Sequence, residues 1–445
     1  MRALKSISSF AFGHVTRYTR PMRAAAAFVV VLAACRGSSD APPPAPAREP
    51  APAPTVAAAS TVTPSKPLVE GATLRPHHEE NVVECPADLS EVSDDEMRVG
   101  LLLEAANRQI EKGAYGAAWT CADRAADITP TSVEAHHLRG ASLAALGRDA
   151  EAQTAYSLAL ALDPDDPETL RAVADFYING KGDRGRDSLR LGLELAQRGS
   201  RRAQARRRRN APLSADLAVL EAQALNDLGR SDEALTRIDA ALRFAPGRGD
   251  ALHEKGVALF DLSKFAEART TLAKALAIQP DDAYTHQMMG LTLEQLGETA
   301  KADAELLRAR ELAPAELSAP ILIPVDEFQR EVDAIVASLP AEKKARVLAI
   351  KIEIADLPDP VDLAAVKPPF PPTILGLYRG PVGHAVQLPP QPGEEPPSIA
   401  LYRKNLARAV KTRAELSEQI RDTLLHEIGH LEGLDEDDLR RRGME

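Results

Sequence analysis

The sequence is poor in aromatic residues and has no excess of positive charge. Phenylalanine, tryptophan and tyrosine make up 4% of its 445 residues, whereas hydrophobic residues of all kinds reach 44%. A chain of this length and composition should hold more than one domain, and those domains should be rich in helix and alanine. The formal net charge of −11 argues against non-specific nucleic-acid binding, because nucleic-acid backbones attract cationic surfaces. We therefore expect no nucleic-acid partner.

The N-terminal region lacks an apolar run long enough to cross a bilayer. Basic residues up to Arg23 precede the apolar residues 24–34, which are too short for a stable membrane-spanning helix and end in Leu32-Ala-Ala-Cys35. This ending resembles a bacterial lipobox, in which the cysteine thiol becomes lipidated. We predict that residues 1–34 are a lipoprotein signal peptide and that Cys35 anchors the exported protein to a membrane of the bacterial cell envelope. Secretion without a lipid is the alternative.

Cysteine is scarce, with three residues in the whole chain. The Pro- and Ala-rich residues 35–80 should form an unfolded tether beyond the anchor. If Cys35 is lipidated, Cys85 and Cys121 remain as an even pair in an oxidising compartment. A disulfide between them would pin the segment before the first helix onto a helical pair. Two free, buried cysteines are the alternative, and a metal role for this pair is not expected.

The middle of the chain has a 34-residue period. It is marked by prolines at 130 and 164 in one group and at 246, 280 and 314 in another. This period resembles that of tetratricopeptide repeats, in which small residues at fixed positions let paired helices approach closely. We predict an α-solenoid over residues 81–318 whose groove binds an extended peptide or a partner helix. The alternative is an array that serves only as a spacer.

The period breaks between residues 167 and 215, where helix-like segments at 168–178 and 188–197 flank a glycine-containing stretch. This region also carries a basic insert near residues 180–214, with Arg201, Arg202 and the run 206–209. The arginines could bind anionic lipid, a polysaccharide or an acidic partner. The alternative, and the more usual role of such a run, is a solvated face or loop.

A second, smaller domain is predicted from residue 319 to residue 445. Residues 325–339 read as a helix that ends at Pro340. Residues 347–354 alternate apolar and charged side chains and read as a strand, and residues 374–378 and 399–403 are further strand candidates. The chain should therefore combine a helical solenoid with a small α+β domain.

The last long helix should start at Thr412, because Glu415 three residues later completes a capping box. Apolar residues then recur every four positions and give this helix one buried stripe, formed by Leu416, Ile420, Leu424 and Ile428. His426 and His430 lie together on a different face. One side of the helix is thus anchored in a core, and the other offers two imidazoles to a cleft.

Two imidazoles one helical turn apart suit a tetrahedral zinc ion. Glu427, next to the first histidine, can take a proton from a water molecule and pass it to a leaving amine. Gly433 lies just beyond the last turn, where a positive φ lets the chain reverse and return the acidic residues 435–438. A third ligand should come from this acidic cluster or from upstream. The alternative is a purely structural histidine pair.

Residues 325–439 resemble the minimal zincin-like metallopeptidases, a group of small bacterial domains. The resemblance rests on the motif His426-Glu-Ile-Gly-His430 and on three upstream segments. These segments are residues 325–332 with 338–340, residues 374–381 and residues 399–403. It implies a small twisted sheet packed on the motif helix, with Glu436 as the third zinc ligand and Asp435 as its rival. It also implies a substrate bound as an added strand at a sheet edge. His384, Tyr378 or Tyr402 could stabilise an oxyanion, although each is more simply a structural residue.

These observations predict a membrane-tethered zinc peptidase whose repeat array recruits a substrate or partner protein. In it, His426, His430 and Glu436 hold the zinc ion and Glu427 is the general base. One alternative is a non-catalytic scaffold lipoprotein with a structural or vestigial zinc site. Another is a peptidase that stays inactive until a partner binds the array.

Overall fold

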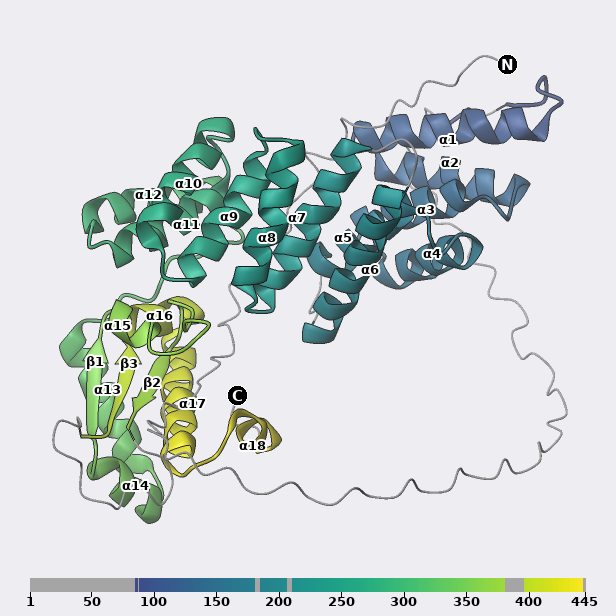
Figure 1. Cartoon of the computed structure of the whole chain (residues 1–445). Helices are drawn as coiled ribbons and strands as arrows, with labels where there is room; N and C mark the ends of the chain where they lie inside the picture. The colour runs from purple at the N-terminus through teal and green to yellow at the C-terminus, as the bar shows by residue number, and fades with distance from the viewer. Residues whose placement is uncertain (1–84, 87, 181–184, 206–209, 381–395, 443–445) are drawn as a thin grey trace, which may run out of the picture. The chain divides into compact units, whose positions relative to one another are not determined.

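The computed structural model describes residues 85–86, 88–180, 185–205, 210–380 and 396–442 (Figure 1). The predicted signal peptide, the predicted lipidation site Cys35 and the predicted tether up to residue 80 lie outside these residues, as do residues 206–209 and His384. Within the described ranges, no helix has both the length and the apolar composition that a membrane crossing requires.

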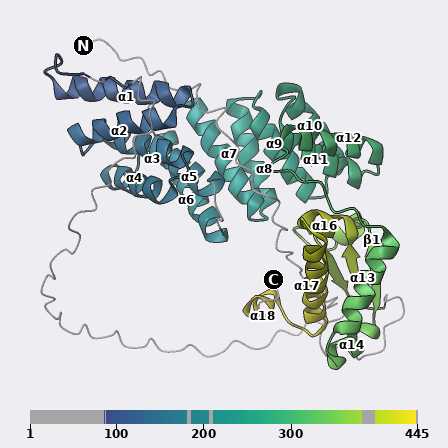
Figure 2. The ribbon, with the colours of Figure 1, turned by 180° about the vertical axis from the view of Figure 1, so that it is seen from behind.

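The repeat region consists of helices that pack in consecutive pairs, α1 with α2, α3 with α4, and so on to α12 (Figures 1 and 2). The predicted α-solenoid is therefore confirmed. Its described helices are α1 (Asp95–Glu111), α2 (Tyr115–Ile128), α3 (Val133–Ala145), α4 (Asp149–Leu162), α5 (Pro167–Asn179), α6 (Arg186–Ala205), α7 (Ala211–Asp227), α8 (Ser231–Phe244), α9 (Gly249–Asp261), α10 (Phe265–Ile278), α11 (Ala283–Gln295) and α12 (Thr299–Leu312).

Small residues set the distance between the paired helices. A Cβ atom added to Gly140 of α3 would lie 2.6 Å from Cδ1 of Tyr156, and one added to Gly290 of α11 would lie 2.6 Å from Cγ of Leu306. The second helices contribute alanines that are at most 1% exposed, namely Ala118, Ala125, Ala152, Ala159, Ala234, Ala241, Ala268, Ala275, Ala302 and Ala309. A larger side chain at these positions would force the helix pairs apart.

The break in the period is occupied by one more helical pair, α5 and α6. The second helix is longer than the predicted 188–197, because its register of buried small and apolar residues continues to Ala203. Part of the basic insert lies on this helix. Arg198 and Arg202 each place Nη2 within 2.9 Å of the Asp165 carboxylate, so these two arginines have partners inside the array.

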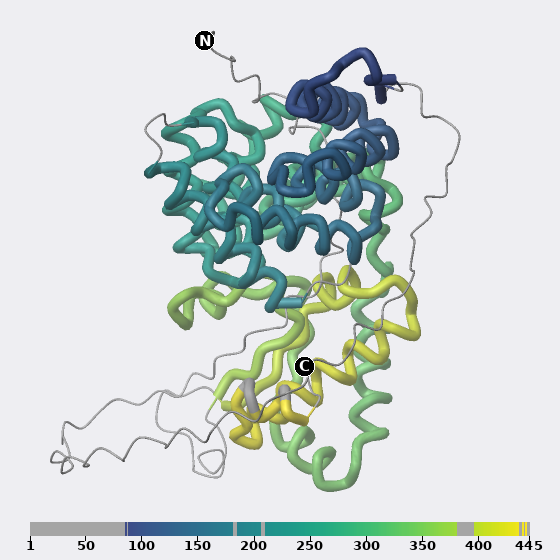
Figure 3. The backbone as a smooth tube through the Cα atoms, turned by 90° about the vertical axis from the view of Figure 1, so that its right-hand side faces the viewer, coloured from purple at the N-terminus to yellow at the C-terminus, as the bar shows by residue number. Residues whose placement is uncertain are grey.

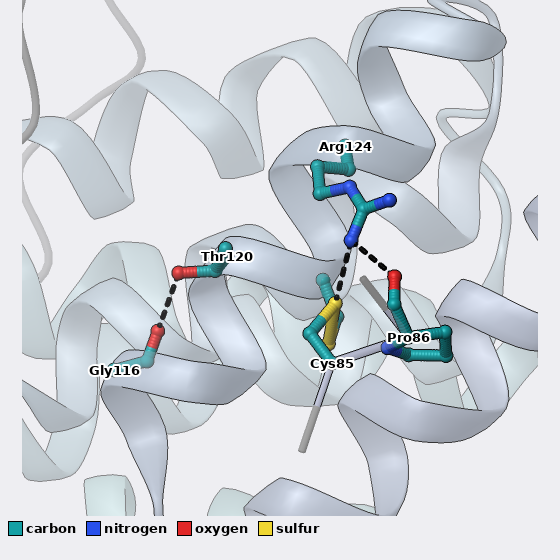
Figure 4. Close-up of a disulfide and its surroundings, with 6 residues drawn as sticks. Cys85, Pro86, Gly116, Thr120 and Arg124 are labelled. Carbon is teal, nitrogen blue, oxygen red and sulfur yellow. Dashed lines mark hydrogen bonds between the residues drawn. A yellow bond between two sulfur atoms is a disulfide. The ribbon is translucent and has the colours of Figure 1, made fainter. Parts of the chain in front are cut away.

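Cys85 and Cys121 form a disulfide, with their Cα atoms 5.6 Å apart (Figure 4). Next to it, Nη1 of Arg124 donates to the carbonyl oxygen of Pro86 at 2.5 Å and to Sγ of Cys85 at 3.6 Å. The covalent bond and these two hydrogen bonds all join the segment before α1 to α2. Of the two states considered for this pair, the structure has the bonded one.

Histidines link successive repeats through hydrogen-bonded networks that are at least partly buried. Nδ1 of His137 lies 3.2 Å from Oγ1 of Thr169, and that hydroxyl donates to Asp166, the N-cap of α5, at 2.9 Å. Because the threonine proton is used by the carboxylate, the imidazole donates from Nδ1. The same arrangement recurs three junctions later, between α9 and α11, in His253, Thr285 and Asp282.

Acidification should destabilise the repeat array through His137. Burial lowers the pKa of this imidazole to about 4, from 6.5 in an unfolded chain. The unfolded state therefore binds a proton first, and the stability contributed by neutral His137 is present above pH 6.5 and lost as the pH falls towards 4. The loss should reach about 2 kcal/mol at pH 5.

We expect the urea concentration at the unfolding midpoint to be lower at pH 5 than at pH 7.5. This difference should be smaller in His137→Gln. His286, whose ring nitrogens contact a carboxylate and a carbonyl oxygen where His137 contacts a hydroxyl, provides a comparison variant in another repeat. An unchanged pH dependence in His137→Gln would contradict this assignment.

The C-terminal domain contains a three-stranded sheet in the order β1-β3-β2, with β1 parallel and β2 antiparallel to β3. The predicted helix at 325–339 and the two later strands are present within two residues of their predicted bounds. The described elements are α13 (Val325–Ser338), α14 (Ala341–Leu348), β1 (Lys351–Ala355), α15 (Pro360–Leu363), β2 (Gly376–Arg379), β3 (Ser398–Tyr402), α16 (Arg403–Ala409), α17 (Arg413–Leu431) and α18 (Glu436–Arg441).

The predicted strand at 347–354 was wrong in its first part. Val347 and Leu348 complete α14, and β1 begins only at Lys351. A short apolar run fits either a strand or the buried side of a helix. Here Val347 is 1% exposed and packs in the domain core as part of a helix that starts after Pro340.

The core of this domain lies between the sheet and helices α13 and α17 (Figure 3). The predicted apolar stripe of α17 enters this core, and its members are at most 1% exposed, namely Leu416, Ile420, Leu424 and Ile428. Helix α17 also contacts β2 and β3. The stripe therefore fixes the rotation of α17 about its axis and, with it, the direction of the histidine face.

Candidate metal centre

Local hydrogen bonds define both ends of α17. At its start, the Glu415 amide donates to Oγ1 of Thr412 at 3.2 Å, and the Lys411 amide donates to Oε2 of Glu415 at 2.8 Å. At its end, Gly433 adopts a φ of 87°, and the Leu434 amide donates to the Gly429 carbonyl at 3.0 Å. The helix thus begins and reverses where the capping residue and the glycine predict.

The two histidine rings meet at the end of this helix. Their centroids are 4.8 Å apart, and the Nε2 atoms of His426 and His430 face each other at 3.1 Å. Nδ1 of His430 donates to the Leu434 carbonyl at 3.0 Å. Because a carbonyl can only accept, this contact places the proton on Nδ1 and leaves Nε2 of His430 as the lone-pair atom.

This arrangement fits a zinc ion. Tetrahedral zinc with imidazole ligands at about 2.0–2.1 Å separates two nitrogen atoms by about 3.3 Å, and the observed separation is 3.1 Å. The contact from His430 to a backbone carbonyl is the kind of outer contact that orients a metal-binding histidine. The imidazole pair therefore has the spacing that the metal requires, and His430 has the matching tautomer.

The histidines are more buried than the sequence predicted. His426 is 8% exposed and His430 is fully buried, whereas we expected both to face a cleft. Part of the reason lies in the turn after Gly433, which folds back so that the Leu434 carbonyl reaches His430. Helix periodicity predicted which face carries the imidazoles but could not predict what covers that face.

Glu427 is held against the sheet. Its side chain is 1% exposed, and Oε2 accepts a hydrogen bond from the backbone amide of Tyr378 in β2 at 2.8 Å. The residue two before Tyr378 is Gly376, whose missing side chain leaves room for the other carboxylate oxygen. The proposed general base thus follows His426 on α17 and bonds to β2, which lies at one edge of the sheet that the structure describes.

The acidic residues after Gly433 do not all approach the histidines. Asp435 is exposed, and its Oδ1 accepts the Asp438 amide at 2.7 Å, so it caps α18. Among the side chains that the structure describes, no three His, Cys, Asp or Glu residues gather closely enough to hold a metal. Asp435 is therefore not brought to the pair. Glu436 begins α18, and its side chain lies outside the described part of the chain.

The two tyrosines considered as oxyanion donors are both buried in the core. Tyr378 is 5% exposed and Tyr402 is fully buried. Burial raises the pKa of the Tyr378 phenol to about 12 and also raises the pKa of Tyr402. Their positions fit the structural role, while His384 lies outside the described residues.

Two contributors to the site were missed because they are backbone groups. The Tyr378 amide and the Leu434 carbonyl orient Glu427 and His430, respectively. No side-chain pattern identifies such groups. Gly376 offered an indirect signal, since a glycine inside a strand often marks the close approach of another element.

Sequence comparison identifies both parts of the chain. The sequence model of the zincin-like metallopeptidase family matches residues 347–444, which include the sheet and α17. Tetratricopeptide-repeat models match residues 133–166 and 249–282. The chain contains tetratricopeptide repeats and a C-terminal zincin-like domain. Both resemblances predicted from the sequence are thereby confirmed, and no curated protein matches the chain significantly.

Solved structures similar to this tetratricopeptide-repeat protein are themselves repeat proteins. PilF from Pseudomonas aeruginosa is 15% identical, covers 53% of this chain and 99% of its own, and has a TM-score of 0.42. PilW, a type IV pilus biogenesis factor, is 16% identical. The match covers 49% of this chain and 94% of PilW, with a TM-score of 0.41. YrrB, described as having an unusual peptide-binding site, is 16% identical. The match covers 43% of this chain and 92% of YrrB, with a TM-score of 0.33.

Proposed function

We propose that the zincin-like domain is a zinc-dependent peptidase. The observation that carries this proposal is the convergence of the His426 and His430 Nε2 atoms at 3.1 Å beside a glutamate in the same helical turn. His426, His430 and Glu436 would hold the zinc ion. A bound zinc ion supplies Lewis acidity for hydrolysis of a peptide bond.

Glu427 is the general base in this proposal. It takes a proton from the attacking water and returns it to the leaving amine. The Tyr378 amide supports this role, because its hydrogen bond to Oε2 fixes the orientation of the carboxylate relative to α17. β2 lies at an edge of the described sheet, next to α17, and Glu427 occupies its outward amide at Tyr378, so a peptide backbone bound along this edge would meet Glu427 there.

The repeat array would recruit the substrate or partner. Tetratricopeptide repeats generally mediate protein–protein interaction, and solenoids of this kind offer a long concave surface to extended peptides. We further infer that the protein is exported and lipid-anchored to the bacterial cell envelope through Cys35. The Cys85–Cys121 disulfide supports export, because such bonds persist in oxidising compartments.

A second candidate function is that of a scaffold lipoprotein whose zinc site is structural. The burial of the site favours this alternative, since Glu427 is 1% exposed and His430 is fully buried. A structural zinc site is closed by protein ligands, whereas a catalytic site keeps one coordination position open.

Metal analysis of the purified full chain, combined with an unbiased peptide-library digest, tests the proposal. We expect about one zinc ion per chain, cleavage that a chelator abolishes, and recovery when zinc is added back. We also expect the cobalt-substituted protein to change its absorption spectrum when a hydroxamate binds. Stoichiometric zinc without cleavage or a hydroxamate response would reject the peptidase and favour the scaffold.

A further inference from the structure

We propose that Gly376 is a positioning residue. Because it has no side chain, α17 lies close to β2 and the Glu427 carboxylate is held where it can act as the general base. The methyl group of Thr423 is the group on α17 that faces Gly376. This inference rests on the peptidase function proposed above. It assigns to the glycine of the edge strand a role that no larger residue could fill.

The first observation is that the structure leaves no room for a side chain at Gly376. A Cβ atom added there would lie 2.7 Å from Cγ2 of Thr423, 3.1 Å from Oε1 of Glu427 and 3.3 Å from the Ala400 carbonyl oxygen. Gly376 is not among the residues with positive φ, so its backbone conformation suits any amino acid. Glycine is needed here for close approach and not for conformational freedom.

The second observation is the position of the two opposing side chains on α17. Thr423 and Glu427 are four residues apart and therefore lie one above the other on one helix face. Both are buried, at 7% and 1% exposure. The face of α17 that carries the proposed base thus rests on β2 at the point where β2 has no side chain.

Strand pairing explains how β2 reaches Glu427. The Tyr402 amide donates to the Leu375 carbonyl, and the antiparallel register then places the Tyr378 amide on the side of β2 that faces away from β3. That amide donates to Oε2 of Glu427 at 2.8 Å. The hydrogen bond at Tyr378 and the close approach at Gly376 therefore depend on the same short distance between α17 and β2.

An added methyl group should lengthen that distance. Ordinary contact between carbon atoms is about 3.5–4.0 Å, so the Thr423 methyl would have to retreat by about 1 Å from its present position. Misplacement of a reacting group by about 1 Å can lower the rate by about 10²-fold. We expect Gly376→Ala to lose about this factor in kcat, with KM changed less than about twofold and zinc content unchanged.

The test compares Gly376→Ala, Thr423→Ser and the double variant Gly376→Ala/Thr423→Ser in the full-length protein. Serine keeps the hydroxyl of Thr423 but removes the methyl group that Gly376→Ala would strike. We expect Thr423→Ser alone to retain activity and the double variant to recover at least about tenfold in kcat over Gly376→Ala. Gly100→Ala, where no atom lies within 4 Å of the added methyl, controls for the substitution itself.

An amide signal provides a readout independent of activity. In protein labelled with [15N]tyrosine, the signal lost in Tyr378→Phe identifies the Tyr378 amide, whose hydrogen bond to a carboxylate should shift its proton downfield. We expect Gly376→Ala to move this signal upfield and the double variant to restore it, in zinc-free protein as well. An unmoved signal, or a moved signal that Thr423→Ser does not restore, would overturn the proposal.

Failure of the peptidase function would look different. In that case the wild-type protein would hydrolyse nothing, yet the amide signal would still move and be restored in the predicted variants. If Gly376→Ala alone does not fold, a folded double variant with the native amide shift supports the proposal, and an unfolded double variant opposes it.

Discussion

Replacing Glu427 with glutamine should abolish peptide hydrolysis while leaving zinc binding intact. Glutamine has nearly the same shape, and its carbonyl oxygen can still accept the Tyr378 amide that now bonds to Oε2. The amide cannot take a proton from water at neutral pH. Loss of general-base catalysis typically lowers a rate by about 10²–10⁴-fold, and we expect kcat/KM to fall within or beyond that range.

The measurement is kcat/KM on a cleaved library peptide, paired with zinc content by elemental analysis. Glu418→Gln is a matched control, because Glu418 lies on the same helix but is exposed. It should leave both quantities unchanged. Turnover retained in Glu427→Gln would mean that another group accepts the proton, and zinc lost in this variant would mean that Glu427 binds the metal.

Replacing His430 with alanine should have the second large effect, removing zinc and destabilising the domain even without metal. The imidazole is fully buried, and its Nδ1 donates to the Leu434 carbonyl that forms the turn after α17. Alanine would leave a cavity and an unsatisfied carbonyl, at a cost of about 1–3 kcal/mol for the lost hydrogen bond alone. Zinc content and the unfolding midpoint of chelator-treated protein measure the two parts separately.

His426→Ala is the comparison for this prediction. It should lose zinc as completely as His430→Ala, since each imidazole supplies one Nε2 atom to the pair. The two variants together separate the metal contribution from the contribution of the turn. Stoichiometric zinc in either one would show that the metal, if present, binds elsewhere.

The sequence predicted the parts of this site that repeat with a helical period or cap a helix. The stripe from Leu416 to Ile428 and the capping box at Thr412 placed α17 within one residue of its start. The four-residue spacing of His426 and His430 predicted that their rings would meet. These features depend on residues that lie close together in the sequence, so they could be predicted without knowing how distant segments pack.

Features that depend on contacts between distant segments were not predictable in this way. The Tyr378 amide reaches Glu427 across 49 residues of sequence, through a strand register that no local pattern defines. The His137–Thr169 contact spans 32 residues and requires two repeats to stack first. The start of β1 was misplaced for a related reason, because Val347 is apolar in either a strand or a helix, and only packing in the core decides between them.

The disulfide between Cys85 and Cys121 has a mechanical consequence. Helix α1, residues Asp95–Glu111, lies entirely inside the covalent loop that this bond closes. A pulling force applied to the chain ahead of Cys85 would therefore bypass α1 and be carried by the covalent bond directly into α2. The first helix of the array is thus shielded from tension that would otherwise unravel it before any other.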